Sequence, residues 1–331
     1  MRNATRPLRC PATGILICCL ALLALTPAAA RGQGPTQMVV VLGDSLSDPG
    51  NGFAFVTSNA TPPDYSLNPL LIPSSPYARG GHHLTNGPTW IEQLARPLGA
   101  PGSMQPAFVG SNPYAMNFAV GTARARSLGP TSPDLAFQIA AFLQKAGGVA
   151  PADALYVVQF GGNDVRDALA AGNPVAANQI VQSAAQSIAA GITALYAAGA
   201  RRFLVWNAPN VGLTPAARIA DVLQPGTAAA ATQLTQLFNG YLFGFLFLPP
   251  NPVAGLPGIQ IVPFDADTLI GSIADAPWLF NLTNVTDACL TPGMPPFTCQ
   301  TPDEYLFWDG VHPTAAAHAL IAQAVGVVLG L

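Results

Sequence analysis

The stretch MVVVLGDSLSDPGNG (Met38–Gly52) begins with a series of apolar residues. Gly-Asp-Ser follows directly, and then a segment rich in Asp, Pro, Gly and Asn. A short apolar run that ends at a glycine is typical of a buried strand, here ending at Gly43. Ser45 follows that strand directly. It is either a nucleophile or a small polar residue of a tight turn, because a serine alone does no chemistry.

Three further runs resemble the first one. They are ADALYVVQFGGND, predicted as a strand that ends at Gly161, then ARRFLVWNAPN and GIQIVPFDA. Between and after them lie helical patterns at Thr89–Leu98, Pro133–Lys145, Pro174–Ala198, Gly226–Leu246 and Thr314–Leu329. Continuous apolar strands that alternate with helices indicate right-handed βαβ units. The sequence therefore predicts an α/β fold, a three-layer α/β/α sandwich with a mainly parallel sheet.

The amino-terminal segment has the three parts of a secretory signal peptide. Three arginines precede the apolar run Gly14–Leu25, and TPAAA follows before Arg31. The run is short for a membrane span, which disfavours an anchor. We therefore expect residues 1–30 to be removed and residues 31–331 to form a single domain of a secreted or periplasmic protein.

Composition narrows the class further. Half of the chain is hydrophobic and only 9% is charged, which excludes a disordered chain. The formal net charge is −3, and residues 1–30 hold three arginines and no acid, so the remainder carries −6. A mildly acidic surface without a basic cluster argues against nucleic acid as a partner. Cys289 and Cys299 remain in the mature chain, and in an exported protein a disulfide is favoured over two free thiols or a zinc site.

A nucleophilic serine needs a base, and the chain has four histidines. His312 lies in FWDGVHPT, three residues after Asp309, whose carboxylate could bond Nδ1 and turn Nε2 toward the serine. His318 falls inside a helical pattern, where we expect a packed or solvated helix residue. His82 and His83 lie in a glycine-rich loop, where we expect solvated residues rather than bases.

Oxyanion donors could come from two other segments. Asn163 follows two glycines in FGGNDV, and NFAVGTA (Asn117–Ala123) offers backbone N–H groups around Gly121. Each fragment has a simpler explanation, since GGND is also a good turn sequence. Position favours chemistry, because Ser45 and Asn163 both follow strands, and sites form beyond the carboxyl ends of parallel strands.

The four blocks VLGDSLSDPGN, NFAVGTA, FGGNDV and DGVHPT occur together and in this order. In them the chain resembles the GDSL esterases and lipases of the SGNH hydrolase superfamily, over about residues 37–331. The resemblance implies a flavodoxin-like SGNH sandwich. It also implies site roles: Ser45 as nucleophile and oxyanion donor, Gly121 and Asn163 as further oxyanion donors, His312 as general base and Asp309 as its orienting carboxylate.

Two positions depart from the family pattern. The family commonly has two adjacent glycines in its second block, whereas Thr122 follows Gly121 here, so either N–H could be the donor. The segment Gly81–Gly87 differs from the family's G-R-F-[ST]-N-G, which puts substrate contacts of this loop in question.

The resemblance implies a secreted serine ester hydrolase that works through an acyl-enzyme, with no metal or organic cofactor. Transfer of the acyl group to another alcohol on lipid substrates is the alternative, and a catalytically silent binding protein is disfavoured because the site residues are present. We expect a small-molecule or lipid ester as substrate, transient contact with lipid surfaces, and a monomer. The apolar loop between Ser45 and Thr85, with Phe53, Tyr65 and Tyr77, either forms an acyl pocket or covers the core.

Overall fold

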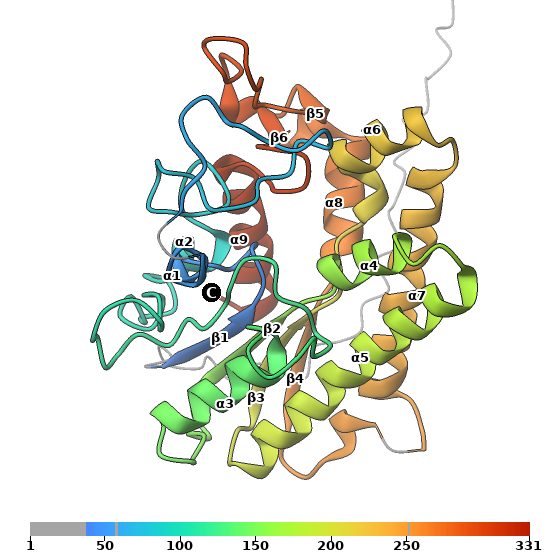
Figure 1. The fold of residues 1–331 in the computed structure, drawn as a ribbon. Coiled ribbons are helices and arrows are strands. Elements are labelled where there is room, and N and C mark those ends of the chain that lie inside the picture. Colours follow the sequence, from blue (N-terminus) through green and yellow to red (C-terminus); the bar gives the residue numbers. More distant parts are fainter. Residues whose placement is uncertain (1–37, 57–58, 251) are drawn as a thin grey trace, which may run out of the picture. The chain divides into compact units, whose positions relative to one another are not determined.

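A computed structural model describes residues 38–331 except 57–58 and 251, all within the compact unit Gly34–Leu331 (Figure 1). The predicted signal peptide, residues 1–30, lies outside the described residues. The signal peptide, the exported location and the single domain over residues 31–331 therefore stay predictions. In the part of the chain that the structure describes, no helix is long and apolar enough to cross a membrane.

The central sheet has four parallel strands in the order β1-β2-β3-β4 (Figure 1). The strands are β1 (Val39–Gly43), β2 (Leu155–Gln159), β3 (Arg202–Trp206) and β4 (Gln260–Phe264). Each lies within one of the four apolar runs of the sequence, so the prediction of these strands is confirmed. Every residue of β1 and β2 is buried, which explains why their apolar runs are continuous rather than alternating.

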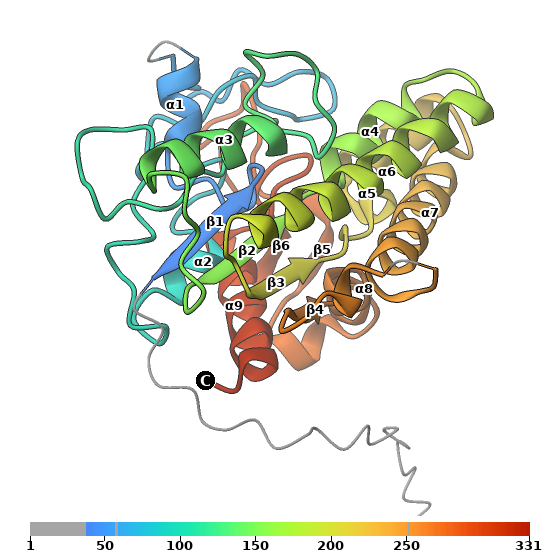
Figure 2. The ribbon, with the colours of Figure 1, turned by 90° about the horizontal axis from the view of Figure 1, so that it is seen from below.

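Helices cover both faces of this sheet (Figure 2). One face packs against α3 (Leu135–Lys145), α5 (Pro174–Ala197) and α7 (Thr227–Phe247), and the other against α2 (Trp90–Gln93), α8 (Ala266–Asp275) and α9 (Ala315–Leu329). Successive residues of β1 serve the two faces in turn: Val40 and Leu42 the first, Val39 and Val41 the second. The predicted three-layer α/β/α sandwich is confirmed.

The short helices differ most from the sequence prediction. The α2 helix is shorter than the predicted Thr89–Leu98, and a capping box between Thr89 and Glu92 marks its start. The second strand ends at Gln159 rather than at Gly161, and the unpredicted α4 (Gly162–Leu169) starts almost at once. Gly161 makes this abrupt change with φ 125, and a Cβ there would lie 2.5 Å from the Phe238 ring.

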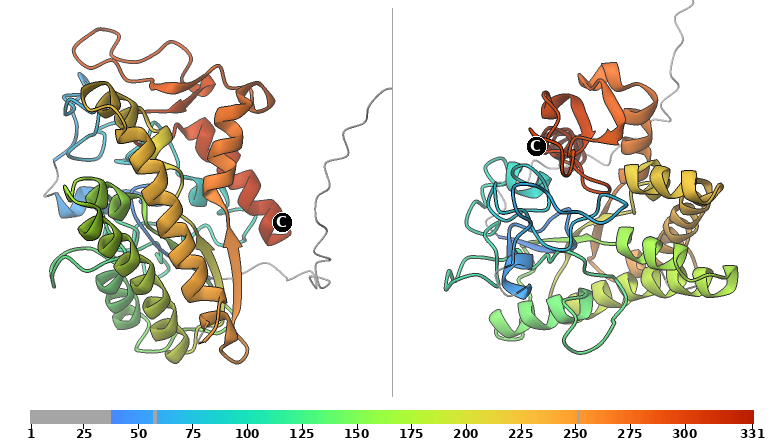
Figure 3. Two further views of the ribbon diagram at one scale, coloured as in Figure 1. Left: turned by 90° about the vertical axis from the view of Figure 1, so that its right-hand side faces the viewer. Right: turned by 45° about the horizontal axis from the view of Figure 1, so that its top comes forward.

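Other short elements also lay outside the prediction: α1 (Asn51–Phe55), α6 (Pro215–Leu223) and the parallel pair β5 (Asn284–Ala288) and β6 (Tyr305–Phe307). Figure 3 shows β5, β6, α6 and the loop after β1 gathered at one end of the sheet. Cys289 and Cys299 are joined there by a disulfide, as predicted.

Candidate active site

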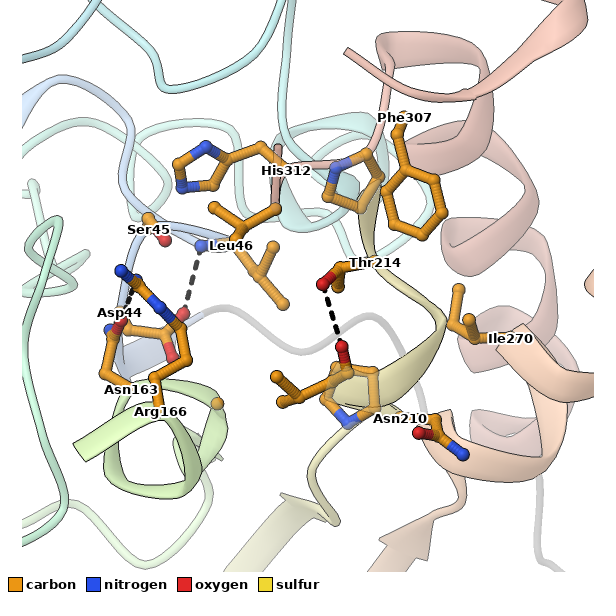
Figure 4. Close-up of a pocket in the computed structure, with 15 residues that line it drawn as sticks. Asp44, Ser45, Leu46, Asn163, Arg166, Asn210, Thr214, Ile270, Phe307 and His312 are labelled. Atoms are coloured by element: carbon orange, nitrogen blue, oxygen red, sulfur yellow. Dashed lines mark hydrogen bonds between the residues drawn. The ribbon is translucent and has the colours of Figure 1, made fainter. Parts of the chain in front are cut away.

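A pocket opens beyond the carboxyl ends of β1, β2 and β3 (Figure 4). Ser45, Asn163 and His312 line it, and Asp309 lies directly behind His312. Three sequence blocks that are far apart in the chain thus meet at one place, as expected for the carboxyl edge of a parallel sheet.

The turn that carries Ser45 is tied to the neighbouring strand through Asp44. The Asp44 carboxylate accepts the Leu46 N–H at 3.0 Å and the Gln159 side-chain amide at 2.9 Å, the latter from the end of β2. Burial raises the pKa of Asp44 above its usual value, and these hydrogen bonds oppose that rise. These contacts hold Ser45 in a defined turn. The Ser45 hydroxyl and N–H themselves make no hydrogen bond to the described residues.

The ring of His312 is oriented by Asp309. The distance from His312 Nδ1 to Asp309 Oδ2 is 2.6 Å, and a carboxylate acceptor means that Nδ1 carries the proton. The other carboxylate oxygen accepts the N–H groups of Val311 and His312, both at 2.8 Å. Asp309 is fully buried, and Nε2 of His312 has no partner in the described part of the chain. The hydrogen bond between His312 and Asp309 is the expected one, but no hydrogen bond joins this ring to Ser45 among the described residues, so the role of His312 as the base stays a prediction.

Tyr77 is a further hydrogen-bond donor to Asp309, and no sequence pattern predicted this contact. Its hydroxyl donates to Asp309 Oδ2 at 2.5 Å, across 232 residues of sequence. Burial, together with the charge of Asp309, raises the pKa of Tyr77 well above 10, so the phenol stays protonated and donates. The Tyr77 ring packs against those of Tyr65 and Trp308 with centroids 5.7 and 6.1 Å away.

The second block reaches the pocket because it runs beside β1. The Val41 N–H donates to the Met116 carbonyl, and Val120 donates to the Gly43 carbonyl at 3.1 Å. This pairing extends the edge of the sheet by one short segment and sets Gly121 beside the turn after Ser45.

The N–H of Gly121 is already used in that position. It donates to Asp48 Oδ2 at 2.7 Å, and a Cβ on Gly121 would lie 2.5 Å from Leu84 Cδ1. By contrast, the N–H of Thr122 has no acceptor among the described residues. Thr122 has φ 69, a conformation that glycine adopts more readily, at the position where the family commonly has its second glycine.

Asn163 links the second and third blocks. Its Nδ2 donates to the Ala123 carbonyl at 3.0 Å, and its Oδ1 accepts a hydrogen bond from Arg166 at 3.2 Å. These two contacts set the direction of the amide and leave one N–H of Nδ2 for another acceptor.

A sequence model of the GDSL-like lipase/acylhydrolase family matches residues 39–325. The chain belongs to this family. Its relatives include the phosphatidylcholine-sterol acyltransferase of Aeromonas hydrophila, with 24% identity over 93% of this chain and 94% of the relative. A GDSL esterase/lipase of Arabidopsis thaliana is 26% identical over 87% of this chain and 84% of its own. The thermolabile hemolysin of Vibrio parahaemolyticus is 23% identical over 89% of this chain and 64% of its own.

Two of the remaining histidines of this GDSL family member are buried, His318 inside a helix and His83 beside a partly exposed acid. His318 is buried and accepts the Trp90 N–H, which confirms it as a packed helix residue. His83 was wrongly predicted as solvated. It is 8% exposed, and its two ring nitrogens bond Glu92 at 3.0 Å and the Gly80 carbonyl. The signal missed in the sequence was an acid nine residues later, at the start of a helix.

Apart from Leu46, the described residues of the loop between Ser45 and Thr85 cover the core instead of lining the pocket. Tyr65 and Tyr77 are buried in a cluster with Trp308 and the Cys289–Cys299 disulfide, and Phe53 stacks on His82. The rest of the pocket wall comes from elsewhere, from apolar residues that the sequence did not single out: Pro209, Val211, Ile270, Phe307, Val311 and Pro313.

Arg166 is a cationic pocket residue that the sequence did not single out. It lies one helical turn after Asn163 in α4. Within the described ranges, no group of three or more His, Cys, Asp or Glu side chains could hold a metal ion. The expectation that the chemistry needs no cofactor stays a prediction.

Proposed function

We propose that this protein is an exported serine hydrolase that cleaves carboxylic esters through an acyl-enzyme. One observation carries the proposal: Ser45 lines the same pocket as His312, whose ring is held by the buried carboxylate of Asp309. Membership of a family of lipases and acylhydrolases supports the same chemistry. The disulfide between Cys289 and Cys299 supports an oxidising, extracytoplasmic location.

In this proposal, His312 Nε2 takes the Ser45 proton as the hydroxyl attacks the ester carbonyl. Asp309 holds the ring in the tautomer with the proton on Nδ1 and stabilises the imidazolium that forms. The imidazolium then protonates the leaving alcohol, and the acyl group stays on Ser45. Water, activated by the same histidine, releases the acid.

Three donors would stabilise the tetrahedral oxyanion. They are the N–H of Ser45, the free N–H of Asn163 Nδ2 and the N–H of Thr122. We assign the second-block role to Thr122 rather than Gly121, because Asp48 already accepts the Gly121 N–H. Loss of one such donor typically raises the barrier by about 3 kcal/mol.

The test of this proposal is the Ser45→Ala variant. We expect the protein to hydrolyse p-nitrophenyl esters, and Ser45→Ala to lower kcat by about 10⁶-fold, by comparison with other serine hydrolases. Ser66→Ala, which removes the hydroxyl of an exposed loop serine, serves as the control and should keep full activity. Full activity in folded Ser45→Ala protein would overturn the assignment of the nucleophile.

Acyl transfer to a second alcohol is the other candidate. Two observations favour it: a relative over nearly the whole chain is named an acyltransferase, and the pocket wall is largely apolar. Adding a long-chain alcohol during ester turnover separates the two activities. A transferase forms the new ester in preference to the free acid, whereas a hydrolase releases the acid throughout.

A further inference from the structure

Arg166 is a cation of the pocket that forms no ion pair with any carboxylate of the described chain. Figure 4 shows it beside Ser45 and Asn163 at one end of the pocket, with Ile270 and Phe307 at the other end. In the described residues its guanidinium makes one hydrogen bond, from Nη1 to Asn163 Oδ1 at 3.2 Å. A guanidinium has five N–H donors, so four of them are not used by the protein here.

The carboxylates whose charge reaches Arg166 are all bound by other groups. Asp167 is held by Arg124 and Arg126, Asp309 by Tyr77 and His312, and Asp44 by Leu46 and Gln159. No carboxylate of the described chain lies within ion-pair distance of Arg166. In the described chain, the guanidinium therefore lies in this pocket without a direct ion pair to a carboxylate.

Two other arginines near α4 provide a comparison. Arg124 pairs with Asp167 at 2.9 Å, and Arg126 pairs with Asp164 at 2.9 Å. A partly buried charge is costly unless it is paired, and these two obey that rule. Arg166 departs from it only where a ligand can enter, which indicates that the missing partner is a ligand group.

We propose that Arg166 binds an oxyanion group of the substrate, a carboxylate or a phosphate, a few bonds from the scissile carbonyl. This rests on the proposed function of Ser45 in the same pocket. The planar fork of a guanidinium matches the two oxygens of such a group. The apolar wall at Ile270 and Phe307 then receives the uncharged part of the molecule, so the preferred substrates are anionic esters with an apolar chain.

The test compares two p-nitrophenyl esters of equal chain length, the neutral pentanoate and the glutarate half ester, which ends in a carboxylate. We expect Arg166→Gln to lower kcat/KM for the half ester about 10- to 100-fold, mainly through KM, because a charged hydrogen-bonded contact is lost. The neutral ester should change several-fold less. Arg166→Lys, which keeps the charge but not the fork, should fall between the two proteins.

The matched control is Arg218→Gln. Arg218 is an exposed residue of α6 that does not line the pocket, so its loss changes net charge equally. It should leave the preference for the half ester unchanged. An equal loss on both esters in Arg166→Gln, repeated with the second pair of substrates described next, would overturn the proposal, because Arg166 would then only position the Asn163 amide.

A second pair of substrates identifies the side of the ester that carries the anion. A monoacylglycerol and its phosphorylated counterpart place a phosphate on the alcohol, whereas the half ester places a carboxylate on the acyl group. Selective loss with either pair supports the proposal and identifies the source, and selective loss with neither overturns it.

Binding without turnover separates this proposal from that of the nucleophile. Calorimetry on Ser45→Ala protein should detect the binding of glutarate or of inorganic phosphate. This binding should disappear in the double variant that also carries Arg166→Gln. Absence of ester hydrolysis in the unaltered protein would contradict the proposed function alone. Absence of binding by either anion would contradict the role of Arg166 alone.

Discussion

The side of the pocket that carries Ser45 and the side that carries His312 are held by different kinds of contact. On the Ser45 side, the Asp48 carboxylate accepts the backbone N–H groups of Gly50, Asn51, Gly52 and Gly121 at 2.6–2.9 Å. On the His312 side, Asp309 depends on Tyr77, a side chain from a distant loop, and on the aromatic cluster around it.

The contacts on the Ser45 side determine backbone geometry, whereas those on the His312 side act on the proton that His312 carries. Four N–H groups on one carboxylate determine the path of the chain near the nucleophile, whereas two donors on Asp309 Oδ2 influence how strongly that oxygen holds the histidine proton. We therefore expect changes on the Ser45 side to reduce stability and activity together, and changes on the His312 side to alter the pH dependence of activity.

The largest effect is expected for Asp48→Ala. The change leaves four buried N–H groups without an acceptor, at about 1–3 kcal/mol each, so the free energy of unfolding should fall by about 4 kcal/mol or more. Urea unfolding measures it, with exposed Asp64→Ala as the control from the same loop. An unchanged midpoint would show that Asp48 does not hold the turn.

A smaller and more specific effect is expected for Tyr77→Phe. Without the phenol, Asp309 Oδ2 accepts a hydrogen bond only from the His312 ring, so it stabilises the protonated form of His312 more strongly. We expect kcat/KM to fall about fivefold, because one hydrogen bond of about 1 kcal/mol that positions Asp309 is lost. We also expect the acid limb of the pH profile to move to higher pH.

Tyr65→Phe is the matched control for this variant, because its hydroxyl has no hydrogen bond among the described residues of the same cluster. A purely structural role of Tyr77 would lower activity in Tyr77→Phe without moving the acid limb.

The smallest effect concerns His83, whose carbonyl accepts the Tyr77 N–H. Burial alone would lower the pKa of His83, but its contacts with Glu92 and Gly80 outweigh this and raise it above 6.5. The folded protein then binds this proton more tightly than the unfolded chain. The stabilisation is complete below about pH 6.5 and is lost as the pH rises through the higher folded pKa.

The measurement is the melting temperature as a function of pH. The melting temperature should fall as the pH rises above 6.5. The matching loss in the free energy of unfolding is no more than about 1 kcal/mol, because Glu92 is partly exposed. Glu92→Gln should make the melting temperature less dependent on pH in this range. Glu304→Gln, an acid without a histidine partner, is the control. An equal slope in Glu92→Gln would show that the ion pair with His83 has no such role.

The sequence allowed the layers and the meeting of the blocks to be predicted, because both depend on local patterns. Apolar runs identified all four strands, and the carboxyl edge of a parallel sheet then brought Ser45 and Asn163 to one pocket. Asp309 and His312 are three residues apart, so their contact was also local.

The features that escaped prediction depend on long-range contacts. The contact of Tyr77 with Asp309 spans 232 residues, and nothing near either residue announces the other. Arg166 lies in an eight-residue helix whose start looked like a turn, because two glycines precede Asn163. The Gly121 N–H was a sensible donor by pattern, but the acceptor that occupies it, Asp48, comes from another block.

The two hydrogen bonds that Asp309 Oδ2 accepts limit how this protein can be redesigned. The loop between α1 and α2 looks replaceable, since none of its described residues lines the pocket. Yet the loop supplies the phenol that shares this oxygen with His312. A grafted loop without Tyr77 would change the hydrogen bonding of Asp309, and through it the basicity of His312, in addition to the surface. An exchanged loop must therefore keep a tyrosine at this position.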